Sequence, residues 1–146
     1  MDKYEKLKLE NQLCFPLYAL SREIIKIYKP FLDKFNLTYT QYITMLAMWE
    51  EEKTTFKYLG NKLHLDSGTL TPVLKKLEAM NLINKYRAKD DDRIVIVELT
   101  ENGLKLKDEV IDIPEQLVSE CGINKEDIIK LKTELDKVIK KFNKNI

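Results

Sequence analysis

The sequence contains few of the residues on which metal sites and many enzyme active sites depend. It has a single histidine, His64, so a metal site with two histidine ligands cannot form, and its four glycines make no phosphate-binding loop. No stretch approaches the roughly 18 apolar residues of a membrane span, and residues 1–6 are charged and lack the apolar segment of a signal peptide. We therefore expect a cytoplasmic protein without metal, cofactor or membrane partner.

Cysteine is also scarce, with only Cys14 and Cys121 in the chain. In the reducing cytoplasm such a pair is not by default a stabilising disulfide, so the thiols are reduced at rest or take part in redox chemistry. Cys14 lies in the apolar and aromatic segment LCFPLY, residues 13–18. A thiol in this setting is either inert packing or a chemical sensor, and the context alone leaves both interpretations open.

Glycine and proline are rare, with four of each among 146 residues. Together with 44% hydrophobic and 34% charged residues, this predicts one helix-rich domain over residues 1–146. Net charge is only +1, but residues 53–93 hold nine Lys or Arg against five Asp or Glu. A basic middle between acidic arms favours a surface that faces phosphate; ordinary surface variation explains the same numbers.

Apolar residues at three- and four-residue spacing predict helices in the first part of the chain. The first helix covers residues 8–28, and Pro30 interrupts or ends it. Thr38 opens a capping box and starts a second helix, and Thr54-Thr55 caps a short third one.

A fourth helix is expected over residues 67–79, with Asn81 suited to the left-handed stop after it. Two short β-type runs follow at 83–87 and 94–99, separated by the polar tip 88–93. The order helix, turn, helix, hairpin is that of a winged helix-turn-helix. The predicted fold is therefore mainly α with a small β-hairpin.

The last part of the chain is expected to be helical again. Thr100 caps a helix from residue 101 to about 112, which Pro114 ends, and Asn124 caps the final helix. Apolar residues of the final helix alternate three and four apart, as in a coiled coil, which indicates a partner helix. Packing within one chain explains this seam too, but apolar helices at both ends of the chain favour a dimer.

The polar face of the helix over 67–79 predicts contact with DNA. Small hydroxyls near its start suit base edges or phosphates, and lysines further along neutralise phosphates. Arg93 at the hairpin tip suits the minor groove, with Asp91 bracing it. Pro72 removes one backbone hydrogen bond, so we expect a local distortion there. A plain solvated polar face is the alternative interpretation.

Several motifs of the chain resemble those of MarR-family repressors. They are LDSGTLTP at 65–72, KKLE at 75–78, and Asp91-Asp92-Arg93 leading into LTENG at 99–103. The segment LENQLCF at 9–15, with Tyr18, YKP at 28–30 and YTQY at 39–42, is similar to the organic-hydroperoxide-sensing branch, the OhrR type. The resemblance extends from about residue 9 to residue 140.

This resemblance implies a homodimer that binds a palindromic operator in double-stranded DNA and represses a peroxidase gene. It also implies that the repressor leaves DNA when an organic hydroperoxide oxidises the cysteine that matches Cys14. Tyrosines that match Tyr28 and Tyr39 hydrogen-bond this cysteine across the dimer. The DNA-binding residues that we expect are Asp66, Ser67, Gly68, Thr69, Thr71, Pro72, Lys75, Lys76 and Arg93, with Asp91 supporting the wing.

Spacing along the first helix supports a dimer independently. Tyr18 lies one turn from Cys14 and is placed to touch it in the same chain. Tyr28 is about 21 Å from Cys14 along a straight helix, at 1.5 Å per residue, so it serves Cys14 only from an antiparallel helix of the partner. We expect dimerisation helices over about 1–36 and 101–146, and the winged helix-turn-helix over about 37–100.

Cys121, followed by Gly122, resembles the resolving cysteine of the two-cysteine family members. A disulfide from Cys14 to Cys121 of the other subunit pulls helices together and resets the spacing of the recognition helices. The alternative is a core Cys121, with oxidised Cys14 resolved by a small cellular thiol. Two other functions stay open: a repressor that answers a bound phenolic or lipid ligand, and a thiol peroxidase, against which the DNA-reading head argues. We expect that the protein is not an enzyme.

Overall fold

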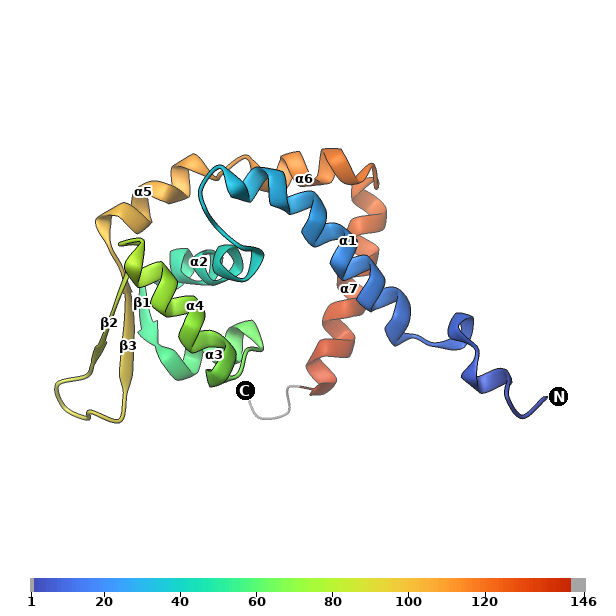
Figure 1. Ribbon diagram of the computed structural model, residues 1–146, viewed down its shortest axis with the longest axis horizontal. Coiled ribbons are helices and arrows are strands. Elements are labelled where there is room, and N and C mark those ends of the chain that lie inside the picture. Colours follow the sequence, from blue (N-terminus) through green and yellow to red (C-terminus); the bar gives the residue numbers. More distant parts are fainter. Residues whose placement is uncertain (1, 143–146) are drawn as a thin grey trace.

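The computed structural model describes residues 2–142, which form a mainly helical fold with a small antiparallel sheet at one end (Figure 1). No helix within this range is long and apolar enough to cross a bilayer. The elements are η1 (Glu5–Leu7), η2 (Leu9–Asn11), α1 (Cys14–Asp33), α2 (Tyr39–Glu51), β1 (Lys53–Thr55), α3 (Phe56–Leu63), α4 (Ser67–Ala79), β2 (Ile83–Arg87), β3 (Val95–Leu99), α5 (Glu101–Glu109), α6 (Ile113–Cys121) and α7 (Lys125–Phe142).

Local signals set the ends of the helices in the winged part of the chain. The Thr38 hydroxyl accepts from the backbone N–H of Gln41 at 3.3 Å, and the Gln41 side chain accepts from the backbone N–H of Thr38 at 3.0 Å, which is the predicted capping box. Thr55 caps α3 by accepting from the backbone of Tyr58 at 3.1 Å. Helix α4 has the predicted bounds and continues through its internal proline, and Asn81 after it adopts a φ of 60°.

The wing is the predicted hairpin of β2 and β3, and a third strand that the sequence did not reveal extends it. Strand β1 pairs with β3, so the order is β1-β3-β2 with both pairings antiparallel. A three-residue strand is too short for an alternating pattern, which explains why it was missed. In the β2–β3 pair, Lys85 is opposite Val97 and Arg87 is opposite Val95.

The first helix differs from its prediction at both ends. It begins at Cys14 rather than at residue 8, because residues 5–11 form the short 3-10 helices η1 and η2. It also passes through Pro30 and ends at Asp33. Proline removes one backbone hydrogen bond, but Leu32 in the same turn is only 1% exposed, and its packing holds the turn in place.

The helix predicted from residue 101 to about 112 is α5, which ends at Glu109, and a further helix that was not predicted, α6, follows it. Thr100 caps α5 as expected, but α5 stops before Pro114. Pro114 lies in the first turn of α6, where the missing N–H would have no partner within the helix, so it begins a helix instead of ending one. Asn124 accepts from the backbone N–H of Asp127 at 2.8 Å and starts α7 as predicted.

One buried junction ties α5 to the winged part of the chain. The indole N–H of Trp49 in α2 donates to the carbonyl oxygen of Gly103 at 2.8 Å. A Cβ atom at Gly103 would lie 2.2 Å from the carbonyl oxygen of Leu82, so only glycine fits this close approach. The start of α5 is therefore fixed against both α2 and the segment that follows α4.

The core lies between α2, α4 and the sheet, and it leaves the long terminal helices largely uncovered. Met45, Leu74 and Ile83 are fully buried, whereas α1 contributes only Leu32, and the described part of α7 contributes no buried residue. The exposed apolar side chains of these two helices, here called the terminal-helix surface, are Leu17, Leu20, Phe15, Tyr18, Ile25, Ile129, Leu131, Val138, Ile139 and Phe142.

Candidate functional site

Cys14 is the first residue of α1, and its side chain is exposed. A hollow lined by Lys8, Leu9, Glu10 and Phe15 adjoins this end of the helix. The chain therefore does not enclose the Cys14 thiol in its own core, and the thiol is reachable by a small reactant.

Tyr18 lies one turn after Cys14 in α1, and its side chain interacts with Arg22. Its hydroxyl oxygen accepts a hydrogen bond from the Arg22 guanidinium at 3.4 Å, and the guanidinium lies 5.4 Å from the centre of the Tyr18 ring. Arg22 lies one turn further along α1, on the opposite side of Tyr18 from Cys14 in the sequence. The polar partner of the Tyr18 hydroxyl is thus Arg22, and a role for Tyr18 beside the thiol stays a prediction.

A cluster of three tyrosines lies towards the other end of α1. The ring of Tyr28 lies 4.9 Å from that of Tyr39 and 5.6 Å from that of Tyr42, measured between centroids. Burial and the two neighbouring phenols raise the pKa of Tyr28, and burial raises the pKa of Tyr39 and of Tyr42. The three phenols therefore stay protonated at neutral pH and remain hydrogen-bond donors.

Cys121 is the last residue of α6, and it lies near this cluster. Its side chain is half-buried, and its electrostatic interaction with Tyr28 is the smallest of the causes that raise the pKa of Tyr28, after burial and the two phenols. The structure thus brings Tyr28, Tyr39 and Cys121 together at one end of α1 and leaves Cys14 at the other. Sequence reasoning missed Tyr42, whose only signal was its place in the YTQY motif.

The predicted recognition helix α4 presents its polar side chains to solvent. The exposed residues are Ser67, Gly68, Thr69, Thr71, Pro72, Lys75 and Lys76. Asp66 is different, because its carboxylate accepts from the backbone N–H of Thr69 at 2.8 Å and caps the helix. This carboxylate therefore fixes the start of α4.

The tip of the wing is held by two arginines. Arg93 donates to both carboxylate oxygens of Asp91 at 3.0 Å, as expected for a bracing contact. This hydrogen bonding lowers the pKa of Asp91 and raises that of Arg93. Arg87, which the sequence did not single out, donates to the backbone carbonyl of Asp92 at 2.7 Å and fixes the tip against the end of β2.

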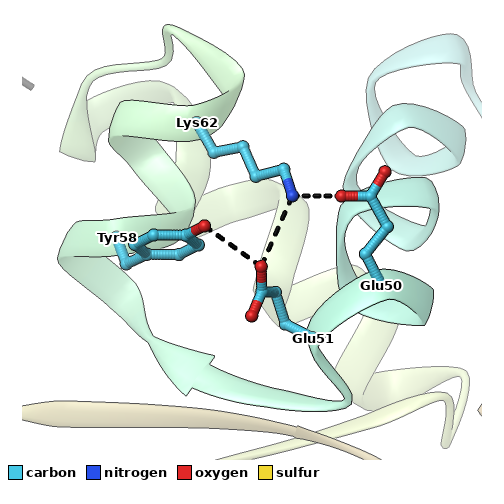
Figure 2. A network of polar contacts seen from close by, with 4 residues as sticks. All are labelled: Glu50, Glu51, Tyr58 and Lys62. Atoms are coloured by element: carbon cyan, nitrogen blue, oxygen red, sulfur yellow. Dashed lines mark hydrogen bonds and ion pairs between the residues drawn. The ribbon is translucent and has the colours of Figure 1, made fainter.

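A polar network joins the end of α2 to α3, the helix before α4 (Figure 2). The Lys62 ammonium contacts the carboxylates of Glu50 and Glu51, and the Tyr58 hydroxyl donates to Glu51 at 3.0 Å. Hydrogen bonding to Glu50 raises the pKa of Lys62. The network helps to fix the angle between the two helices, and no spacing in the sequence predicts it because the partners lie on different helices.

Residues 2–142 include no group of three or more His, Cys, Asp or Glu side chains placed to hold a metal ion. This part of the chain instead offers a separated thiol and tyrosine cluster on the terminal helices, and an exposed polar helix beside a cationic wing.

Comparisons of sequence and of structure with known proteins both relate this chain to transcriptional regulators. Residues 26–110 match the family described as "Transcriptional regulator SarA/Rot". The chain is 49% identical over 134 residues to the organic hydroperoxide resistance transcriptional regulator of Bacillus subtilis, which covers 92% of this chain and 91% of that protein.

Solved structures of AbfR, a protein of Staphylococcus epidermidis, are similar to the whole chain. Reduced AbfR bound to DNA is 35% identical, with a TM-score of 0.78 and coverage of 97% of this chain and 99% of that one. The disulfide form of AbfR is 36% identical and covers 94% and 96%, but its TM-score is lower, at 0.65. The chain belongs to the SarA/Rot family of MarR-type winged-helix transcriptional regulators, in the branch related to organic hydroperoxide regulators.

Proposed function

We propose that this protein is a homodimeric repressor that binds operator DNA and releases it when an organic hydroperoxide oxidises Cys14. The observation that carries the proposal is the separation along α1 of an exposed thiol from a cluster of protonated phenols beside a second thiol. Within one straight helix, Cys14 and Tyr28 are about 21 Å apart at 1.5 Å per residue, so neither serves the other in the same chain.

A two-fold dimer brings the two ends together. If the first helices of two subunits run antiparallel, Cys14 of one subunit meets Tyr28, Tyr39 and Cys121 of the other. The terminal-helix surface supports this arrangement, because exposed apolar side chains recurring along two long helices need a partner. We accordingly assign dimerisation to about residues 1–36 and 101–146, and DNA binding to about 37–100.

The chemistry follows from this pairing. The Cys14 thiolate attacks one peroxide oxygen, the O–O bond breaks, and the alkoxide leaves as an alcohol after taking a proton. Sulfur is oxidised by two electrons to a sulfenic acid, and the hydroperoxide is reduced. Phenols of Tyr28 and Tyr39 donate hydrogen bonds to the thiolate before attack and orient it.

The second thiol then completes the switch. The Cys121 thiolate of the other subunit attacks the sulfenic sulfur, the S–O bond breaks, hydroxide leaves and takes a proton to become water, and a disulfide joins the subunits. The half-buried position of Cys121 beside Tyr28 supports this role. The helices must move to bring the two sulfurs within bonding distance, and this movement changes the spacing between the two α4 helices.

Reading of DNA is assigned to α4 and the wing. Helix α4 enters the major groove with Ser67, Gly68, Thr69, Thr71, Pro72, Lys75 and Lys76 at the contact, and Asp66 fixes its start. Arg93, braced by Asp91, enters the adjacent minor groove. The protein acts on transcription, and one oxidation per site suffices, so it is not a peroxidase that turns over.

The proposal is tested by binding to the protein's own upstream DNA. Anisotropy of a labelled duplex is measured with and without cumene hydroperoxide for the native chain and for Cys14→Ser. We expect oxidant to release the native chain at least tenfold more readily, and Cys14→Ser to stay bound. Release of both proteins to the same extent would instead favour a repressor with a non-covalent ligand.

A second experiment tests Cys121. After oxidation, non-reducing electrophoresis should show a covalent dimer of the native chain and a monomer band for Cys121→Ser. A cross-linked dimer that persists in Cys121→Ser contradicts the resolving role. Repeated consumption of peroxide with a thiol reductant, without affinity for DNA, would contradict the repressor itself.

A further inference from the structure

A hollow of about 370 Å³ lies between helix α4 and strand β2. Ser67 and Thr71 line it from the helix, and Lys85 and Arg87 line it from the strand. The remaining lining residues are Phe56, Tyr86 and Val95, so the wall of this α4–β2 hollow contains no carboxylate. Two cations and the hydroxyls of Ser67 and Thr71 therefore line one space, while the third hydroxyl, that of Tyr86, donates to the Glu98 carboxylate at 2.8 Å.

The register of the sheet makes the two cations unexpected. Residues opposed in an antiparallel pair share a face, so Lys85 shares the face of buried Val97, and Arg87 that of Val95. Ile83 begins the same row and is fully buried. An alternating strand would continue this row with apolar residues, and departures from the local pattern are where functional sites are expected.

Both cations are held near the hollow by contacts that leave their charges available. The backbone N–H of Lys85 donates to the Glu78 carboxylate of α4 at 3.1 Å, which ties the strand to the helix without using the ammonium. The guanidinium of Arg87 donates from one nitrogen to the carbonyl of Asp92, a neutral acceptor. Its other N–H groups remain in the planar fork that binds phosphate well.

The shape of duplex DNA indicates which part of the duplex fits the α4–β2 hollow. Major and minor grooves are separated by a sugar–phosphate strand, so a helix in one groove and a wing in the next must straddle that strand. The space between α4 and the wing is the α4–β2 hollow. We propose that this hollow holds one sugar–phosphate strand, with Lys85 and Arg87 binding its phosphates and the Ser67 and Thr71 hydroxyls donating to them.

The inference rests on the proposed DNA-binding function and adds strand β2 to the contact surface. The apolar residues Phe56 and Val95 lie at the wall where the deoxyribose would pack. Contacts to phosphate carry no base information. Lys85 should therefore set affinity and register on the duplex, whereas α4 and the wing tip set sequence preference.

A structural role for Lys85 predicts a different outcome. Strand β2 is at the edge of the sheet, and charges that point inward on edge strands prevent pairing with other molecules. In that case Lys85→Gln should self-associate and keep its affinity for DNA, which would overturn the proposal.

The experiment measures binding of the full-length protein to its upstream duplex, and to an unrelated duplex of equal length, across a salt series. For Lys85→Gln we expect affinity to fall on the order of tenfold on both duplexes. The slope of log affinity against log salt should flatten by about 0.9 for each lost contact, thus by about 1.8 for a dimer with two hollows.

Matched variants keep this result interpretable. Lys107→Gln, with the same charge change in the last turn of α5, should leave the slope unchanged, and Lys85→Arg should restore it. A Lys85→Gln protein that melts like the native chain and keeps the native slope overturns the phosphate contact. Failure of the native protein to bind its upstream DNA refutes the proposed function instead, so the two failures are distinguishable.

Discussion

The winged part of the molecule and its terminal helices meet the demand for burial in opposite ways. Helices α2 and α4 and the sheet bury their apolar residues against one another, and every buried side-chain polar atom in the described residues has a hydrogen-bond partner. Helices α1 and α7 expose most of their apolar residues. The first region is complete within one chain, whereas the second requires another surface to be stable in water.

The largest expected effect lies in the winged part. Leu74 is fully buried in α4, so Leu74→Ala should lower the free energy of unfolding by about 2–5 kcal/mol through lost burial and the cavity left behind. Urea denaturation followed by circular dichroism measures this change. Leu104→Ala, at a position 41% exposed, is the control and should cost much less. Equal losses in the two variants would contradict the proposed boundary of the core.

Substitutions on the terminal helices should weaken dimerisation. Leu17→Asp in α1 and Leu131→Asp in α7 place a charge on the terminal-helix surface, and burying an unpaired charge is strongly unfavourable. We expect the dimer dissociation constant to rise at least a hundredfold in sedimentation experiments. Lys125→Asp, at an exposed position at the start of α7, is the control for added charge. Dimers of unchanged affinity in both leucine variants would show that the partner uses another surface.

A variant at the junction between the two regions should have a smaller effect on stability than Leu74→Ala. Trp49→Phe removes the donor to Gly103 and leaves a buried carbonyl without its partner, at a cost of about 1–3 kcal/mol in unfolding free energy. Urea denaturation at several protein concentrations checks it. If the cost disappears when the protein is diluted to monomer, the junction supports dimerisation instead of the winged fold.

The tyrosine cluster should have the smallest effect, because it changes the stability of the fold only at alkaline pH. Because the folded pKa of Tyr28 is raised above its unfolded value of about 10, its contribution is fully present below pH 10 and is lost as pH rises above it. Stability should therefore be constant from neutral pH to about pH 9 and then fall. In thermal melts at increasing pH, the stability of Tyr28→Phe should fall less steeply than that of the native chain. Identical alkaline profiles of the two proteins would argue against burial of this phenol.

Sequence patterns predicted the features that depend on neighbouring residues. Thr38, Thr55, Thr100 and Asn124 cap helices as expected, because a cap is a contact over three residues. Pro114 was misassigned because proline is tolerated at the start of a helix as well as after its end, and only packing decides between the two.

Features that depend on distant contacts could not be predicted. Strand β1 is defined by its pairing with β3, more than 40 residues along the chain, and carries no pattern of its own. The closeness of Cys121 to Tyr28 and the brace from Arg87 to Asp92 likewise arise only when helices and strands pack. Spacing did predict that Cys14 and Tyr28 lie at different ends of one helix, since helical rise is fixed by the backbone.

That helix, α1, fixes the distance between the thiol and the tyrosines by its length. The number of residues between Cys14 and Tyr28 sets both the distance between them and the face on which each lies, and inserting one residue turns everything beyond it by about 100° and advances it by about 1.5 Å. A substitution along this stretch changes the contacts of one side chain, whereas a change in its length moves the thiol out of phase with all of the tyrosines. Insertions and deletions in α1, more than substitutions, should therefore be the changes that this chain cannot tolerate.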